Sequence, residues 1–202
     1  AEDPKYASLP FNKNRGGFVI AEGAAMLILE EYEHAKARGA EILGEICGYG
    51  NTCDAYHVTA PRPDGKTQAA AIRSALEEAG YVSDEVLYIN AHGTGTPLND
   101  VSETQAFKLA LGEDAYKAHI SSTKGAMGHM LGAAGAAEAV ASVLALRNGI
   151  VPPTVNLDEV DPECDLNYTP GAAVKADLTM ALSDSLGFGG HNGCIVFRKY
   201  DE

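Results

Sequence analysis

The apolar positions of this chain form two kinds of pattern, compact runs and longer helical stripes, which alternate along the sequence. Compact runs bounded by turn residues are typical of strands, whereas apolar residues that recur once per helical turn are typical of helices. The runs predict strands at 41–49, 86–91, 119–122, 181–186 and 194–198. The stripes predict helices at 67–79, 101–111 and 133–148, ended by Gly80, Gly112 and Gly149. This order predicts an α/β fold built as a βαβαβαββ unit.

A shorter apolar pattern precedes this unit. Residues 18–21 and 25–29 are apolar runs separated by Glu22-Gly23-Ala24, which predicts a hairpin. A helix over 30–38 follows and ends at Gly39. A two-stranded hairpin is only marginally stable alone, so we expect this one to join a larger sheet.

Two segments lack a regular apolar pattern. Residues 1–17 are polar and irregular, and nothing in them indicates a core contribution. The connection over 150–176 contains four prolines, and we expect it to pack on the surface rather than to form a domain.

Composition and charge narrow the classes of function. The chain has 202 residues, of which 46% are apolar and 21% charged, so it can bury a sizeable core. A net charge of −13 repels phosphate backbones and anionic membrane surfaces, which argues against nucleic-acid and membrane partners. No apolar run approaches the ~18 residues of a membrane helix, and the N-terminus lacks a signal-peptide pattern. We therefore expect a cytoplasmic protein, with the interior of an organelle as the alternative location.

The cysteines and histidines give no metal-site pattern. The four cysteines show no CxxC pairing, and no histidine has the spacing of a metal ligand set, so we predict no metal site. Cys47 and Cys194 lie in strand-like apolar runs and are expected in the core, whereas Cys53 and Cys164 lie in predicted loops.

Two histidines leave two predicted strands in the same way. His92, preceded by Asn90, is followed by glycines and by the hydroxyls of Thr94 and Thr96, and His129 follows the next strand through a loop of small residues. Ligands of α/β folds gather where loops leave the carboxyl ends of strands. Two neutral imidazole N–H groups aimed at one oxygen stabilise an enolate, as an oxyanion hole does. The pair predicts polarisation of one carbonyl, although a structural role is the alternative for each histidine alone.

Charged residues near these histidines need partners. Lys124 lies between Ser-Ser-Thr and a glycine, where it can pair with a carboxylate, and Asp100 and Glu103 are the candidates. Asp100 can instead cap the next helix, with Glu103 completing a capping box. Glu138 is the single acid of the apolar helix over 133–148, which predicts a buried carboxylate held in a structural network.

Four stretches of the chain resemble the C-terminal half of β-ketoacyl-[acyl-carrier-protein] synthases of the type II fatty-acid elongating class. They are NAHGTGTPLND, SSTKGAMGHMLGAAGAAE, VPPTVNLD and SLGFGGHN. The resemblance covers essentially the whole chain and implies a thiolase-like fold, in which two βαβαβαββ halves stack, each with a five-stranded mixed sheet between helical layers. Residues 1–39 would be the tail end of the N-terminal half, including its last hairpin, and residues 40–202 the C-terminal half.

The resemblance also implies an activity, the decarboxylative Claisen condensation of a malonyl thioester with an acyl thioester in fatty acid biosynthesis. His92 and His129 would bind the malonyl thioester carbonyl and stabilise the enolate. Lys124 would be a site lysine tied to Glu103. Phe188 would be a gating residue whose backbone N–H helps to form an oxyanion hole.

The remaining implied roles concern the thioester arm and the partners. Thr94 and Thr96 would hydrogen-bond the pantetheine arm, and Thr59 and Pro61 would line its tunnel. No separate cofactor is expected, because phosphopantetheine arrives on the acyl carrier protein. The expected partners are that carrier, the N-terminal half and a second copy in a homodimer.

The chain departs from the family pattern at one turn and lacks one essential group. His191 stands where the family usually has threonine, which alters the hydrogen bonding of that turn. The nucleophilic cysteine of the family lies in the N-terminal half, and none of the four cysteines here matches its setting. We therefore expect no condensing activity from this chain alone. The alternative function is that of a non-catalytic, chain-length-factor-like partner subunit.

Overall fold

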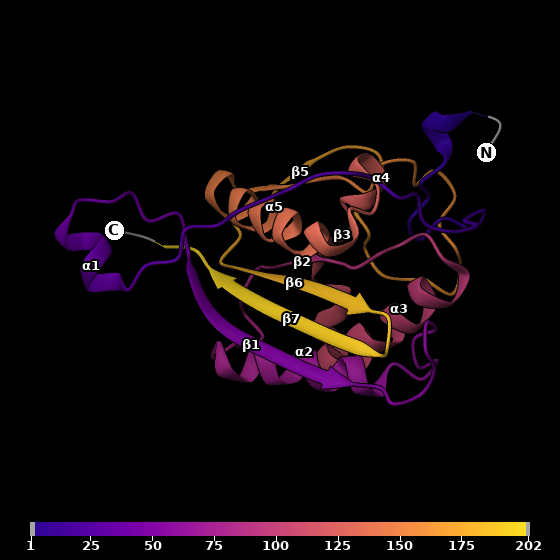
Figure 1. The fold of residues 1–202 in the computed structure, drawn as a ribbon, viewed down its shortest axis with the longest axis horizontal. Coiled ribbons are helices and arrows are strands. Elements are labelled where there is room, and N and C mark those ends of the chain that lie inside the picture. Colours follow the sequence, from indigo (N-terminus) through magenta and orange to yellow (C-terminus); the bar gives the residue numbers. More distant parts are fainter. Residues whose placement is uncertain (1–2, 201–202) are drawn as a thin grey trace.

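A five-stranded mixed sheet forms the centre of the computed structural model, which describes residues 3–200 (Figure 1). The strands lie in the order β1-β7-β6-β2-β3. Their bounds are Glu45–Cys53, His191–Arg198, Met180–Gly187, Leu87–Asn90 and His119–Ser121 in that same order. Strand β2 pairs parallel with both β3 and β6, whereas β7 pairs antiparallel with β6 and β1. The sheet thus has a parallel half and an antiparallel half.

Helices cover both faces of this sheet. Helices α2 (Lys66–Glu78) and α3 (Pro97–Leu111) lie on one face, and α5 (Ala134–Asn148) lies on the other (Figure 1). Each face has its own cluster of buried apolar side chains, the larger one beneath α2 and α3. The observed order of main-sheet strands and covering helices confirms the predicted βαβαβαββ unit.

Strand β1 begins four residues later than the predicted strand over 41–49, because its bounds depend on pairing with β7 rather than on local apolarity. In this register Gly48 and Gly50 face α2, and the absence of side chains there lets the helix backbone approach the strand. Helix α3 begins four residues before the predicted helix, since Thr96 caps it and Pro97 occupies its first turn.

The predicted hairpin over 18–29 is wrong. No strand forms among residues 18–29, and the segment contributes only an isolated parallel bridge between Ile20 and His129. Strands need backbone partners, and no strand of residues 3–200 pairs with this segment, so Met26 and Ile28 stay 88% and 82% exposed. The helix that follows does form, as α1 (Tyr32–Ala37), at one end of the molecule (Figure 1).

The two segments without regular pattern contribute to the core, contrary to expectation. Phe11 is fully buried and stacks on Tyr168 of the long connection, with ring centroids 3.8 Å apart. Cys164 of that connection is also buried, and burial raises the pKa of its thiol to about 12. The connection additionally forms a small ladder between β4 (Ile150–Val151) and β5 (Val174–Lys175).

Short helical turns complete the described fold. They are the 3₁₀ helices η1, η2 and η3 (Pro4–Tyr6, Gly112–Tyr116, Leu131–Ala133) and the one-turn helix α4 (Lys124–Met127). Among residues 3–200, every helix is too short or too polar to span a bilayer.

The packing of α2 on β1 generates a prediction. Gly50→Ala should lower the free energy of unfolding by about 1–3 kcal/mol, because overpacking forces α2 away from β1. A Cβ at position 50 would lie 1.9 Å from the carbonyl oxygen of Ala71. Urea unfolding of the protein that carries this chain measures the change. Gly16→Ala is the matched control, since no heavy atom lies within 4 Å of a Cβ there. Equal stability of the two variants would contradict this packing.

Candidate functional site

The carboxyl ends of two parallel strands bring the predicted site residues together. Strands β2 and β3 pair in parallel, from Tyr88 opposite His119 to Asn90 opposite Ser121. The loops that follow the two strands therefore leave the sheet at the same edge. His92 lies two residues beyond β2, and Lys124 begins α4 just beyond β3. The sequence-based placement of these loops at one site is therefore confirmed.

The two histidine rings are neighbours. The ring centroids of His92 and His129 lie 5.3 Å apart, with the ring planes at 86°. The backbone of His129 is held by residues 19–21, because its N–H donates to the carbonyl oxygen of Val19 at 2.7 Å and its carbonyl accepts from the Ala21 N–H at 2.9 Å. The ring of Phe18 packs edge-on against His129, at a centroid distance of 5.3 Å.

Hydrogen bonds to Nδ1 select the same tautomer for both imidazoles. The backbone N–H of Leu131 donates to Nδ1 of His129 at 3.2 Å. The ammonium of Lys124, which can only donate, lies 3.4 Å from Nδ1 of His92. An Nδ1 atom that accepts a hydrogen bond leaves the ring proton on Nε2. Each ring therefore offers one Nε2–H donor on the edge opposite its Nδ1 contact.

The surroundings keep both imidazoles neutral. Burial lowers the pKa of His92 well below 6.5, and the charge of Lys124 lowers it further. Burial together with the Lys124 charge lowers the pKa of His129 to about 4. At neutral pH both rings are thus uncharged donors.

Lys124 pairs with Glu138, and the implied tie between Lys124 and Glu103 is wrong. The Lys124 ammonium forms a buried ion pair with the Glu138 carboxylate and also donates to the carbonyl oxygen of His92 at 2.6 Å. Burial raises the pKa of Glu138, while the Lys124 charge opposes that rise. Glu138, from α5, is thus the network residue that its apolar helix predicted.

Glu103 is occupied by the backbone of the β2–α3 loop. Its two carboxylate oxygens accept the N–H groups of His92 at 2.6 Å and of Gly93 at 2.8 Å. The capping role considered for Asp100 is also wrong, since Thr96 is the cap of α3. Asp100 instead accepts the N–H groups of Phe11 at 2.7 Å and of Gly95 at 3.2 Å. These two acids hold the loop that carries His92.

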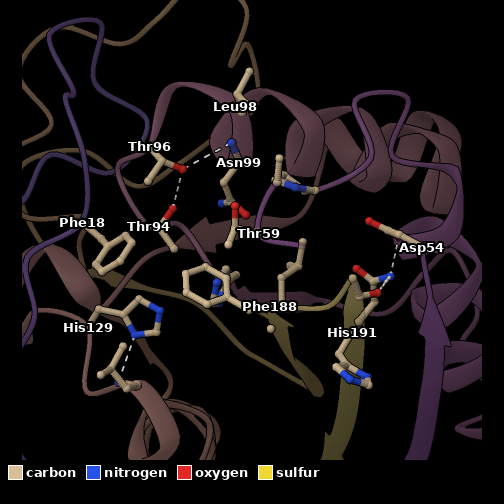
Figure 2. A pocket seen from close by; sticks show the side chains of 18 of the residues that line it. Phe18, Asp54, Thr59, Thr94, Thr96, Leu98, Asn99, His129, Phe188 and His191 are labelled. Carbon is tan, nitrogen blue, oxygen red and sulfur yellow. Dashed lines mark hydrogen bonds between the residues drawn. The ribbon is translucent and has the colours of Figure 1, made fainter. Parts of the chain in front are cut away.

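A cavity of about 730 Å³ opens beside the two histidines (Figure 2). The predicted residues that line it are His92, His129, Thr59, Pro61, Thr94, Thr96 and Phe188. Figure 2 shows Thr94 and Thr96 on one side of the cavity, and the Phe188 ring near its middle. The other predicted residues (Asn90, Asp100, Glu103, Lys124 and Glu138) are buried and do not line it.

Sequence reasoning missed a pair of residues that shapes the far wall. Asp54 accepts hydrogen bonds from Nδ2 of Asn192 and from the backbone N–H of Arg62, both at 2.8 Å. The N–H of Asp54 donates to the carbonyl oxygen of Gly190 at 2.8 Å, so the loop after β1 is tied to the glycine turn. The one available signal was Asn192, in the same motif as Phe188. His191 lines the same wall.

Known proteins resemble this chain in sequence and in structure. A family model described as the C-terminal domain of β-ketoacyl synthase matches residues 43–158. A 3-oxoacyl-[acyl-carrier-protein] synthase 2 from Synechocystis sp. is 56% identical over 199 residues, which cover 98% of this chain and 48% of the relative. The chain therefore spans about half the length of the curated relatives that it matches.

Solved structures that resemble this chain are also ketosynthases. One match lies in a complex of a type II PKS acyl-carrier protein with its ketosynthase bound to the hexaketide. It has a TM-score of 0.96 and 44% identity, and it covers 100% of this chain and 49% of that one. A chain of the ishigamide ketosynthase/chain length factor has a TM-score of 0.91 and 41% identity, over 96% of this chain and 47% of that one. The predicted thiolase-like α/β fold is confirmed.

The neutral state of His129 can be tested by titration. ¹⁵N NMR of the imidazole should give a midpoint at about pH 4 and an Nε2-protonated tautomer at neutral pH. The pKa of His129 in the folded state lies below the ordinary value of 6.5, so His129 favours the folded state when the pH is above 6.5. Its contribution is lost as the pH falls towards the lowered pKa. A midpoint near 6.5, or an Nδ1-protonated ring, would contradict the geometry.

Proposed function

The chain belongs to the β-ketoacyl synthase family as its C-terminal domain, and we propose that it supplies the decarboxylation half of a 3-oxoacyl-[acyl-carrier-protein] synthase site. The observation that carries the proposal is the pair of neutral imidazoles, 5.3 Å apart beside one cavity. Two convergent neutral donors suit a reaction in which negative charge develops on a carbonyl oxygen.

The chemistry follows from those donors. A malonyl thioester binds with its carbonyl oxygen between the Nε2–H groups of His92 and His129. The bond from the α-carbon to the carboxylate breaks, CO₂ leaves, and the electron pair forms an enolate on the thioester. The two N–H groups stabilise the enolate oxygen and need give up no proton. The α-carbon then attacks the acyl thioester, and the cysteine thiolate leaves.

Lys124 and Glu103 support this step without touching the substrate. Lys124 holds the carbonyl of His92 and Glu103 holds its N–H, so both peptide groups of this residue are fixed. A donor fixed before substrate arrives has little reorganisation to undergo as charge develops. Their proposed role is to position His92.

The other cavity residues are proposed to bind the thioester arm. Thr94 and Thr96 present hydroxyls 2.9 Å apart, suited to the amides of a pantetheine arm, and Thr59 and Pro61 line the same cavity. Phe188 is 65% exposed at the glycine turn, where a ring can swing as a gate. Its backbone N–H is proposed to help form an oxyanion hole separate from the histidine pair. Phosphopantetheine enters as part of the carrier substrate.

The complete enzyme requires partners. We propose that residues 1–39 end an N-terminal half and that residues 40–202 form the C-terminal half, with the nucleophilic cysteine upstream. A relative of 56% identity that is about twice as long supports this division. The exposed apolar side chains of residues 18–29 support a contact with that half. An acyl carrier protein, a homodimer and a cytoplasmic location complete the proposal, the carrier by analogy with the solved ketosynthase complex.

A non-catalytic, chain-length-factor-like subunit is the alternative. His92, His129 and the Lys124–Glu138 pair form a set of groups suited to stabilising an enolate. A non-catalytic subunit would not need such a set, so its presence favours the enzyme. The residue at the nucleophile position of the N-terminal half separates the two functions. A cysteine there supports the enzyme.

Mutation of the histidines tests the proposed function. In the protein that joins this chain to its N-terminal half, His92→Ala and His129→Ala should each lower malonyl-carrier decarboxylation about 10²–10³-fold, as the loss of an oxyanion-hole donor does. The release of CO₂ from labelled malonyl carrier measures the change.

The matched control is His34→Ala. His34 lies on α1, where its side chain is 69% exposed and pairs with Glu30. Its removal should leave decarboxylation unchanged. If His92→Ala or His129→Ala retained full decarboxylation activity, the proposed function would be contradicted.

A further inference from the structure

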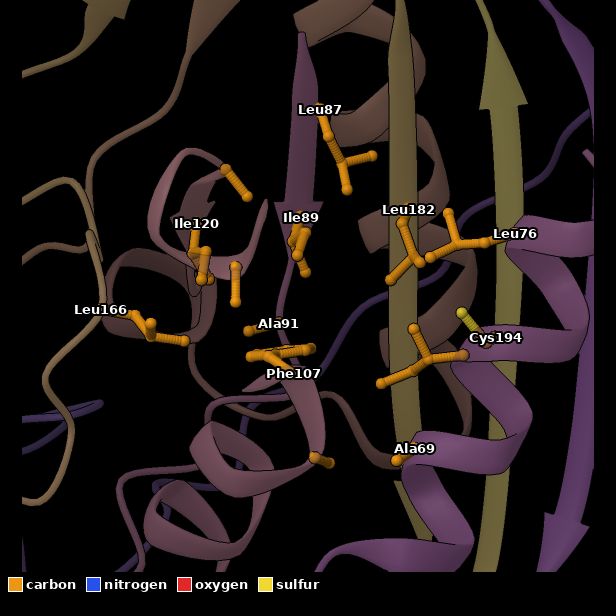
Figure 3. Close-up of a cluster of buried hydrophobic side chains, with 14 of the residues drawn as sticks. Ala69, Leu76, Leu87, Ile89, Ala91, Phe107, Ile120, Leu166, Leu182 and Cys194 are labelled. Atoms are coloured by element: carbon orange, nitrogen blue, oxygen red, sulfur yellow. The ribbon is translucent and has the colours of Figure 1, made fainter. Parts of the chain in front are cut away.

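Two fully buried carboxyl groups lie against each other behind the site. Glu103 of α3 and Asp184 of β6 are both 0% exposed, and their side chains are close enough for a hydrogen bond to form if one carboxyl holds a proton. Asp184 lies two positions after Leu182, so both point to the sheet face that α2 and α3 cover. Figure 3 shows Leu182 in the apolar cluster on that face. The mechanism above gives Asp184 no role.

A hydrogen bond between two carboxyls requires a proton on one of them. Ionised carboxylates are acceptors only, and two like charges this close in a dry interior repel each other strongly. Burial raises the pKa of both Glu103 and Asp184. Ionisation of either carboxyl further disfavours ionisation of the other. The pair therefore holds one proton where exposed carboxyls hold none.

Hydrogen-bond donors locate the negative charge on Glu103. Its two oxygens accept the N–H groups of His92 and Gly93 and a third donor, Nδ2 of Asn99 at 3.2 Å. Asp184 accepts only Nε2 of Gln68, at 2.5 Å, and its buried Oδ1 has no hydrogen-bonded donor among the described residues. A proton on Oδ1 turns this orphaned acceptor into a donor.

Neighbouring charges leave no counter-ion for a second negative charge. The groups that face the pair are Gln68 of α2, Asp100 of α3, Lys124 of α4, Glu138 of α5 and Cys194 of β7. Lys124 is the only cation among them, and it is already paired with Glu138. Burial raises the pKa of the Cys194 thiol, so Cys194 adds no charge of its own.

We propose that Asp184 is a positioning residue that works as a neutral carboxylic acid. Its O–H donates to Glu103, which in turn holds the backbone N–H groups of His92 and Gly93. Loss of the proton at high pH places a second negative charge beside Glu103 and loosens the loop that aims His92. The catalytic consequence rests on the proposed function, whereas the protonation state does not.

Infrared spectroscopy tests the protonation state directly. In the joined protein at neutral pH, the carbonyl band of a protonated carboxyl should be present and should shift in D₂O. The band should be absent from Asp184→Asn, because Glu103 is then the ionised partner of an amide. Absence of this band from the unsubstituted protein would overturn the proposal, whether or not the protein is active.

A pair of isosteric variants tests the positioning role. Asp184→Asn keeps a neutral donor beside Glu103, so kcat for decarboxylation at neutral pH should stay within about threefold. The decline of kcat on the alkaline side of the pH profile should weaken. Glu103→Gln turns an amide group towards backbone N–H donors, and kcat should fall more than about tenfold. The reverse order of effects would place the charge on Asp184 and refute the assignment.

If Glu103→Gln folds poorly, the pH dependence of stability, measured on the unsubstituted protein and on Asp184→Asn, still tests the proposal. A carboxyl with a raised pKa stabilises the fold most below its ordinary pKa, and the benefit is lost as the pH rises through the raised value. Relative to Asp184→Asn, the unsubstituted protein should therefore lose stability to urea as the pH rises from acidic to alkaline. A pH-independent difference between the two proteins would contradict the shared proton.

Discussion

The buried ammonium of Lys124 is the charge on which the geometry of the site depends. It lies between the carboxylate of Glu138 and the carbonyl oxygen of His92, at 2.6 Å from that oxygen, and Lys124 is only 1% exposed. A charge in this position costs several kcal/mol unless it is paired and hydrogen-bonded. The need to satisfy it ties α5 to the loop after β2. The same ammonium lowers the pKa of both histidines and faces Nδ1 of His92.

His92 is held from two opposite directions. Lys124 donates a hydrogen bond to the backbone carbonyl of His92, and Glu103 accepts one from the backbone N–H of His92. The two anchors come from different faces of the sheet, because Glu103 lies on α3 and the Lys124 partner Glu138 lies on α5. The ring is therefore oriented before any ligand binds, and an electrophilic site needs such preorganisation.

Local patterns were enough to predict the strands of the main sheet and the place of the site. Strands β2 and β3 are short and parallel, and each is followed by small residues around a histidine, so the rule for strand ends applied directly. The pairing of Lys124 could not be predicted, because three acids were available and only the packing of α5 selects Glu138. Phe11 could not be predicted either. It lies in a polar segment with a positive φ of 58°, and its burial depends on stacking against Tyr168.

The hairpin expected over 18–29 marks the limit of pattern reasoning. Its apolar residues were identified correctly, but a strand exists only where another backbone accepts its hydrogen bonds. Within residues 3–200 that backbone is supplied at one point, by His129 opposite Ile20.

We propose that one thioester oxygen accepts hydrogen bonds from Nε2 of His92 and of His129 together. A crystal structure of the joined protein with a non-decarboxylating malonyl thioester analogue tests it most directly. The account predicts that both Nε2 atoms lie about 2.7–3.2 Å from the carbonyl oxygen of the analogue. A bound analogue whose carbonyl oxygen contacts only one ring, or neither, would contradict it.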